Sequence, residues 1–143
     1  MASPKFEILG FTRHTDCALP LYLAPVQAGF PSPAEDYIDQ TLDLNDQLVR
    51  HPAATFFVRV TGQSMRDANI HPGDILVVDR ALEAQNGTIV VAALDGELTV
   101  KRLRHKDGRL LLVPDNPDFA PLEVSPEASF TVWGVVTYII HKA

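Results

Sequence analysis

The segment 89–103 reads IVVAALDGELTVKRL and contains the strongest fold signal in the chain. An uncharged apolar run, Ile89–Leu94, precedes Asp95-Gly96, and a second run of polar and apolar residues follows. An Asp-Gly pair between two such runs is typical of a two-residue β-hairpin turn. Counting back from that turn pairs Val90 with Lys101. The hairpin therefore places Lys101 opposite a strand that carries no charge.

Further strand-like runs lie on both sides of the hairpin. They are rich in β-branched, aliphatic and aromatic residues and cover Thr55–Val60, Ile75–Val78, Arg109–Val113 and Phe130–Ile140. One short helix is predicted over Leu44–Pro52, with Asn45 as its N-cap and Pro52 as its end. Because short strands separated by turn signals dominate, we predict a mainly β domain of strands and hairpins over residues 40–143.

Size and composition limit the class of protein. The chain has 143 residues, of which 46% are hydrophobic and 21% charged, which suits one domain with a core. Its net charge of −6 argues against non-specific binding of duplex DNA, since that requires a strongly basic face. The single cysteine, Cys17, excludes an internal disulfide and a multi-cysteine metal site, and it suits a reducing compartment. We expect no metal and no cofactor.

The N-terminal region differs from the rest in charge and in proline content. Residues 1–28 have no net charge, because two basic residues balance two acidic ones, and prolines stand at positions 25, 31 and 33. Proline cannot donate to a strand ladder and biases the preceding residue to extended conformations. We predict an extended arm and linker over 1–34 rather than a folded unit, with 1–28 as the arm and 29–39 as the linker.

No segment of the sequence is suited to a membrane or to secretion. Ile89–Leu94 is the longest uninterrupted apolar run, and a membrane-spanning helix needs roughly 20 such residues. The N-terminus, MASPKFEILGF, lacks the basic and apolar regions of a secretory signal. We therefore expect a soluble, cytoplasmic protein.

A candidate nucleophile lies in the segment Gly62–Asp74, between two predicted strands. Gly62 permits a sharp exit from the first strand, and the residues after Ser64 have room for one helical turn before Pro72-Gly73. Free backbone N–H groups near residues 64 and 65 would then face a developing oxyanion. The alternative is that Ser64 only caps the turn, as serine often does.

Lys101 is the candidate base for this serine. The five histidines, His14, His51, His71, His105 and His141, are scattered without a triad-like or metal-ligand pattern. A lysine facing an uncharged strand loses hydration, so its pKa falls from about 10.4 toward the range of a general base. The alternative is that Lys101 belongs to a solvated basic strand, although alternation puts Arg102 and Arg104 on the opposite face.

A third feature is the Ala28-Gly29 pair in the proline-rich region. Small residues let a peptide bond enter a narrow catalytic cleft, and the flanking prolines keep the segment extended. The alternative is a linker with no chemical role.

The order of these features resembles the LexA/UmuD family of self-cleaving Ser-Lys peptidases. The similarity runs from about Val26 to Val136 and is closest to the UmuD branch. Four segments carry it: Val26–Ala34, which resembles the cleavage region, Gly62–Met65, which resembles the nucleophile segment, and Gly73–Asp79 and Asp95–Lys101, which resemble the strands of the Ser-Lys site.

The resemblance implies a largely β domain with a flexible N-terminal arm and assigns roles to residues of this chain. It implies that Ser64 attacks the Ala28–Gly29 bond, that neutral Lys101 takes the proton, and that the backbone N–H groups of Ser64 and Met65 stabilise the oxyanion. It also implies a homodimer whose cleavage is promoted by a RecA filament on single-stranded DNA during the SOS response. The trimmed product would join an error-prone, UmuC-type translesion DNA polymerase, without direct sequence-specific DNA binding.

Two departures from the family pattern bear on the function. Many UmuD proteins have Cys-Gly at the scissile bond, whereas this chain has Ala28-Gly29, as LexA does. LexA repressors also carry a helix-turn-helix domain before the bond, which 28 residues with three prolines do not accommodate. The alternatives are a non-catalytic polymerase accessory module and a LexA-type repressor fragment. A signal peptidase with the same chemistry is disfavoured, because it would need a membrane anchor. We assign no role to Cys17.

Overall fold

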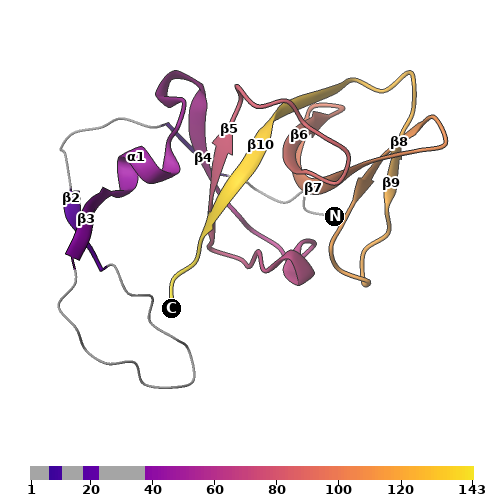
Figure 1. Ribbon diagram of the computed structural model, residues 1–143. Coiled ribbons are helices and arrows are strands. Elements are labelled where there is room, and N and C mark those ends of the chain that lie inside the picture. The colour runs from indigo at the N-terminus through magenta and orange to yellow at the C-terminus, as the bar shows by residue number, and fades with distance from the viewer. Residues whose placement is uncertain (1–6, 11–17, 23–37) are drawn as a thin grey trace. The chain divides into compact units, whose positions relative to one another are not determined.

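The computed structural model describes residues 7–10, 18–22 and 38–143 (Figure 1). It separates into two compact units: residues 1–11 together with 51–143, and residues 12–50. The prediction started the β domain at residue 40, whereas residues 40–50 group with the second unit.

The larger unit is built on one antiparallel sheet of eight strands, which confirms the predicted mainly β fold. Figure 1 shows the long strand β10 beside β5 and β6. In spatial order the strands are β1 (Glu7–Gly10), β4 (Thr55–Arg59), β5 (Ile75–Asp79), β10 (Phe130–Ile140), β6 (Ile89–Leu94), β7 (Glu97–Lys106), β8 (Arg109–Val113) and β9 (Leu122–Val124).

The β6–β7 hairpin has the predicted register. Val90 pairs with Lys101 across the two strands. Asp95 and Gly96 both have positive φ, 49° and 84°, as the two-residue turn that matches the strand twist requires. β7 continues beyond the predicted end to Lys106 and there pairs with β8. Lys101 thus lies in the middle of a strand that is fixed at both ends.

The two faces of this hairpin pack in different core clusters. Val91 and Val100 belong to a cluster that also contains Met65 and Ile70, from the segment after β4. The other face contributes to a cluster of Val90, Ala92, Leu103 and Leu112. Alternation along β7 puts Lys101 on the second face. The first cluster therefore fixes the segment that contains Ser64.

The helix of the smaller unit differs from its prediction. α1 spans Leu44–Leu48, and the prediction of Asn45 as its N-cap is wrong. Asp43 caps the helix, because its carboxylate accepts a hydrogen bond from the Asn45 backbone N–H at 2.9 Å. The helix also ends before Pro52, which instead begins the short 3₁₀ helix η1 (Pro52–Ala54) of the larger unit. Proline suits that first position because its missing N–H has no partner to lose there.

Four strands were absent from the predictions. Two lie within the predicted arm: β1, which pairs with β4, and β2 (Ala18–Tyr22). The third, β3 (Ile38–Asp43), begins in the predicted linker and pairs with β2. The fourth, β9, has only three residues and pairs with β8. Each gains its hydrogen bonds from a partner strand, and a short segment has no local pattern that reveals such a partner.

Gly134 marks the closest approach between two central strands. A Cβ atom there would lie 2.7 Å from Val78 Cγ1 and 3.1 Å from the Asp79 carbonyl oxygen. We therefore expect Gly134→Ala to lower the free energy of unfolding by about 1–3 kcal/mol through overpacking. Urea denaturation measures the effect, and Thr131→Ala, at an exposed position of the same strand, is the control. A Gly134→Ala variant as stable as the control would contradict the close packing.

Candidate active site

The Ser64 segment is a loop held at both ends. The Val60 N–H donates to the Asp74 carbonyl oxygen at 2.9 Å, and the Gly73 N–H donates back to the Val60 carbonyl oxygen at 2.8 Å. The predicted turn at Pro72-Gly73 is present, because Gly73 has φ of 90° and the Asp74 N–H donates to the His71 carbonyl oxygen at 3.0 Å. The loop therefore leaves and rejoins the sheet at fixed points.

Ser64 is not a helix cap. The predicted helical turn is present as the 3₁₀ helix η2 (Arg66–Ala68), but its N-cap residue is Met65 and no side chain caps it. The Ser64 hydroxyl oxygen instead accepts a hydrogen bond from Lys101 Nζ at 2.9 Å. The buried Met65 side chain, 3% exposed, anchors the loop beside this contact. The structure thus brings together the two predicted side chains across 37 residues of sequence.

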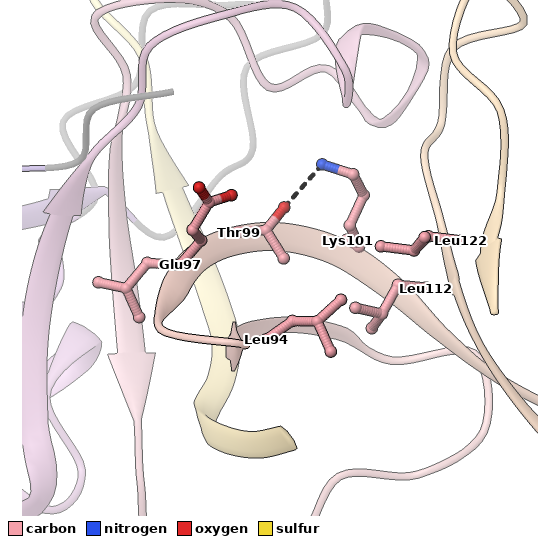
Figure 2. Close-up of a pocket in the computed structure, with 7 residues that line it drawn as sticks. Leu94, Glu97, Thr99, Lys101, Leu112 and Leu122 are labelled. Atoms are coloured by element: carbon pink, nitrogen blue, oxygen red, sulfur yellow. Dashed lines mark hydrogen bonds between the residues drawn. The ribbon is translucent and has the colours of Figure 1, made fainter. Parts of the chain in front are cut away.

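Lys101 lies between two hollows of the surface. On one side is an apolar pocket of about 140 Å³, whose lining includes Leu94, Leu112 and Leu122. Figure 2 shows these leucines near the aliphatic part of Lys101, with the amine directed toward Thr99. On the other side is a smaller cleft of about 80 Å³, which Ser64 and Lys101 both line. Burial of the amine among these residues removes part of its hydration and lowers the pKa of Lys101 from 10.5 to about 8.

Either form of the lysine can make the three contacts of the amine, since the ammonium donates in all three and the neutral amine donates in two. Lys101 Nζ lies 2.8 Å from Thr99 Oγ1, 3.1 Å from the Val100 carbonyl oxygen and 2.9 Å from Ser64 Oγ. A neutral amine has two N–H donors and one lone pair. It can therefore donate to Thr99 and Val100 while its lone pair accepts the hydroxyl proton of Ser64, which is the geometry that a general base requires.

Two backbone donors are available at Ser64, the candidate nucleophile. Among the residues that the structure describes, the N–H groups of Ser64 and Met65 donate to no protein acceptor. Adjacent free N–H groups beside a nucleophile are a common form of oxyanion hole. The predicted oxyanion donors are thus free to act in this role.

Three interactions of the site were not predicted. The first is the contact between Thr99 and Lys101. The sequence could have indicated it, because Thr99 lies two residues before Lys101 and therefore on the same strand face. The other two involve the loop after β8: Asn116 Nδ2 donates to the Gln63 carbonyl oxygen at 2.7 Å, and Arg102 forms an ion pair with Asp115 at 2.6 Å. No local pattern in the sequence indicates either contact.

Three of the four histidines in the described residues have side-chain partners away from Ser64, and the fourth, His105, is exposed. His51 and His141 contact the buried carboxylates of Asp79 and Asp74, at 2.6 and 2.7 Å, and His71 contacts Asn69 at 2.9 Å. Within the same residues, no group of three or more His, Cys, Asp or Glu side chains is placed to hold a metal ion.

Several predicted features lie outside the described residues. They are the proposed scissile pair Ala28-Gly29, Cys17 and His14. In the part of the chain that the structure does describe, none of the helices is long and apolar enough to cross a membrane.

The burial of Lys101 has a measurable effect on stability. Between about pH 8 and about pH 10.5 the unfolded chain binds a proton that the folded protein does not, so wild-type stability rises with pH in this window. Lys101→Met lacks this titration. We expect its advantage in unfolding free energy over the wild type to be largest below about pH 8 and to shrink as the pH rises toward 10.5.

Denaturation with urea at several pH values measures this difference. Lys106→Met, at the exposed end of the same strand, reports the effect of losing a surface charge. A difference between Lys101→Met and wild type that stays constant across the window would contradict the burial of the amine.

The mainly β fold agrees with comparisons to known proteins. The Peptidase S24-like family model matches residues 20–137, so the chain belongs to this family of peptidases. Protein MucA of Salmonella typhimurium is 51% identical over 135 residues, which cover 93% of this chain and 90% of MucA. Protein ImpA of Shigella flexneri is 51% identical over 124 residues, 86% of this chain and 83% of ImpA.

A repressor is also among the relatives. The LexA repressor of Paracidovorax citrulli is 43% identical over 124 residues, which cover 87% of this chain and 54% of the repressor. These matches confirm the resemblance to the LexA/UmuD family that the sequence motifs indicated.

Proposed function

We propose that the protein is a self-cleaving serine peptidase in which Ser64 and Lys101 hydrolyse the Ala28–Gly29 bond. The observation that carries this proposal is the 2.9 Å contact between Lys101 Nζ and Ser64 Oγ, made by a lysine whose pKa burial lowers to about 8. Membership of a peptidase family supports it.

The first half of the reaction forms an acyl-enzyme. Neutral Lys101 takes the hydroxyl proton as Ser64 Oγ bonds to the Ala28 carbonyl carbon, and the N–H groups of Ser64 and Met65 bind the resulting oxyanion. The C–N bond then breaks. The Gly29 nitrogen receives the proton from Lys101 and leaves as the new N-terminus.

The second half releases the arm. Lys101, neutral again, takes a proton from a water molecule that attacks the ester between Ala28 and Ser64. The ester breaks, residues 1–28 leave with a carboxyl terminus, and Ser64 recovers its proton. No metal or cofactor takes part.

The biological setting of the proposal follows from the family resemblance. Cleavage is promoted by a RecA filament on single-stranded DNA during the SOS response, and the homodimeric product serves an error-prone, UmuC-type translesion DNA polymerase in the cytoplasm. The 51% identity to MucA, against 43% to the LexA repressor, favours this setting over a repressor fragment.

Damage-induced mutagenesis in cells tests this function. Cells that lack their own protein of this type receive the wild type, Ser64→Ala, or residues 29–143 produced directly. We expect the wild type and the shortened chain to restore mutagenesis and Ser64→Ala to fail. If Ser64→Ala restores mutagenesis as well as the wild type does, the protein acts as an accessory module that needs no cleavage.

A further inference from the structure

The loop after β8 packs against the nucleophile loop through a buried asparagine. Asn116 is 4% exposed, and its side-chain amide is hydrogen-bonded through both its nitrogen and its oxygen. Its Nδ2 donates to the Gln63 carbonyl oxygen at 2.7 Å, and its Oδ1 accepts from the Asp118 N–H at 3.0 Å. An amide side chain provides a donor and an acceptor together, which this position uses.

Neighbouring contacts fix the position of Asn116. Arg102 holds the Asp115 carboxylate with Nε at 3.1 and 3.2 Å and Nη2 at 2.6 Å, and its Nη1 donates to the Gly87 carbonyl oxygen at 2.7 Å. The Asp115 carbonyl oxygen accepts from the Asp67 N–H at 2.7 Å. The loop after β8 is therefore tied both to β7 and to the residues that follow Ser64.

The contact with Gln63 determines where the Ser64 N–H points. The Gln63 carbonyl and the Ser64 N–H belong to one planar trans peptide group, so they point in opposite directions. Asn116 Nδ2 and the Arg66 N–H, at 3.2 Å, both hold that carbonyl oxygen. The Ser64 N–H is thereby directed away from Asn116, and it belongs to a residue that lines the cleft shared with Lys101.

We propose that Asn116 is a positioning residue that orients the Gln63–Ser64 peptide so that the Ser64 N–H can bind the oxyanion. This inference rests on the proposed self-cleavage. Asn116 is not among the residues that line the cleft, so it acts on the reaction through the backbone of Ser64.

Two substitutions test the proposal, with self-cleavage rates measured from pH 6 to 10. Asn116→Ala removes the donor and introduces no charge. Removing one oxyanion donor lowers kcat about 10²–10³-fold, and a misdirected donor lowers it less. We therefore expect the plateau rate of self-cleavage to fall about 10- to 100-fold. The midpoint of the pH–rate profile stays near pH 8, because Lys101 keeps its environment.

Asn116→Asp keeps the size of the side chain and the acceptor for the Asp118 N–H, but it replaces the donor that faces Gln63. It is compared with the wild type on the high-pH plateau alone, and we expect a fall at least as large as for Asn116→Ala. Asp118→Asn, on the exposed part of the same loop, is the matched control and keeps the wild-type rate.

Each outcome decides the proposal. Wild-type rates in both Asn116 variants overturn it and leave the proposed function intact, whereas failure of the wild type to cleave itself overturns both. A midpoint in Asn116→Ala that moves toward pH 10.5 shows that the site has opened and that Asn116 is only structural. Thermal unfolding is recorded for each variant, and Asn116→Asp decides if Asn116→Ala does not fold. Loss of folding in both variants contradicts a positioning role.

Discussion

Ser64→Ala is expected to abolish self-cleavage while leaving the fold intact. The substitution removes the oxygen that would bond to the Ala28 carbonyl carbon. Among the described side chains, only Thr99 then remains as a hydrogen-bond acceptor for Lys101 Nζ. Loss of a nucleophile in a serine hydrolase lowers the rate by up to about 10⁶-fold, so we expect a fall of at least about 10⁴-fold. Gel electrophoresis over days at pH 9 measures the remaining rate.

Two controls accompany this experiment. Ser125→Ala changes an exposed serine and should cleave at the wild-type rate. Thermal unfolding should show that Ser64→Ala remains folded, because Ser64 is only partly buried and lies outside the core clusters. Cleavage of Ser64→Ala at the same bond would rule out the proposed nucleophile.

Lys101→Met is expected to remove both the activity and its pH dependence. In the wild type only the neutral amine acts as a base, so the rate should rise about tenfold per pH unit below about pH 8 and level off above it. Methionine keeps the apolar stem but has no lone pair of comparable basicity. We expect the rate at pH 9 to fall by at least about 10³-fold, with no rise up to pH 8.

Lys106→Met separates this effect from the loss of any lysine on β7. Its side chain is exposed, and it should keep both the wild-type rate and the wild-type pH profile. A wild-type profile whose midpoint lies near 10.5 would mean that Lys101 is solvated in the reacting protein. A pH-dependent rate that survives in Lys101→Met would assign the base to another group.

The sequence predicted those parts of the molecule that local patterns determine. The Asp95-Gly96 turn set the register of the hairpin, and that register placed Lys101 opposite Val90 as counted. The absence of charge on the partner strand then predicted the direction of the lysine pKa shift correctly. Gly62 and Pro72-Gly73 predicted the loop that presents Ser64, since both need specific backbone angles.

Other parts depend on contacts between distant segments, and no local pattern reveals them. The Asn116–Gln63 hydrogen bond spans 53 residues, and neither residue type signals the other. Arg102 was expected on a solvated strand face, but its ion pair with Asp115 holds the loop after β8 against β7. The prediction of the helix N-cap was wrong for a different reason. Asp43 and Asn45 are both good capping residues, and only the backbone angles decide between them.

The intact masses of the products test the central claim most directly. Purified wild-type protein is held at pH 9, and the reaction is followed by mass spectrometry. We predict two products, residues 1–28 and 29–143, whose masses together exceed that of the intact chain by one water molecule. We predict that Ser64→Ala, treated in the same way, gives neither product. An intact wild-type chain, or products that end at a bond other than Ala28–Gly29, would contradict the account.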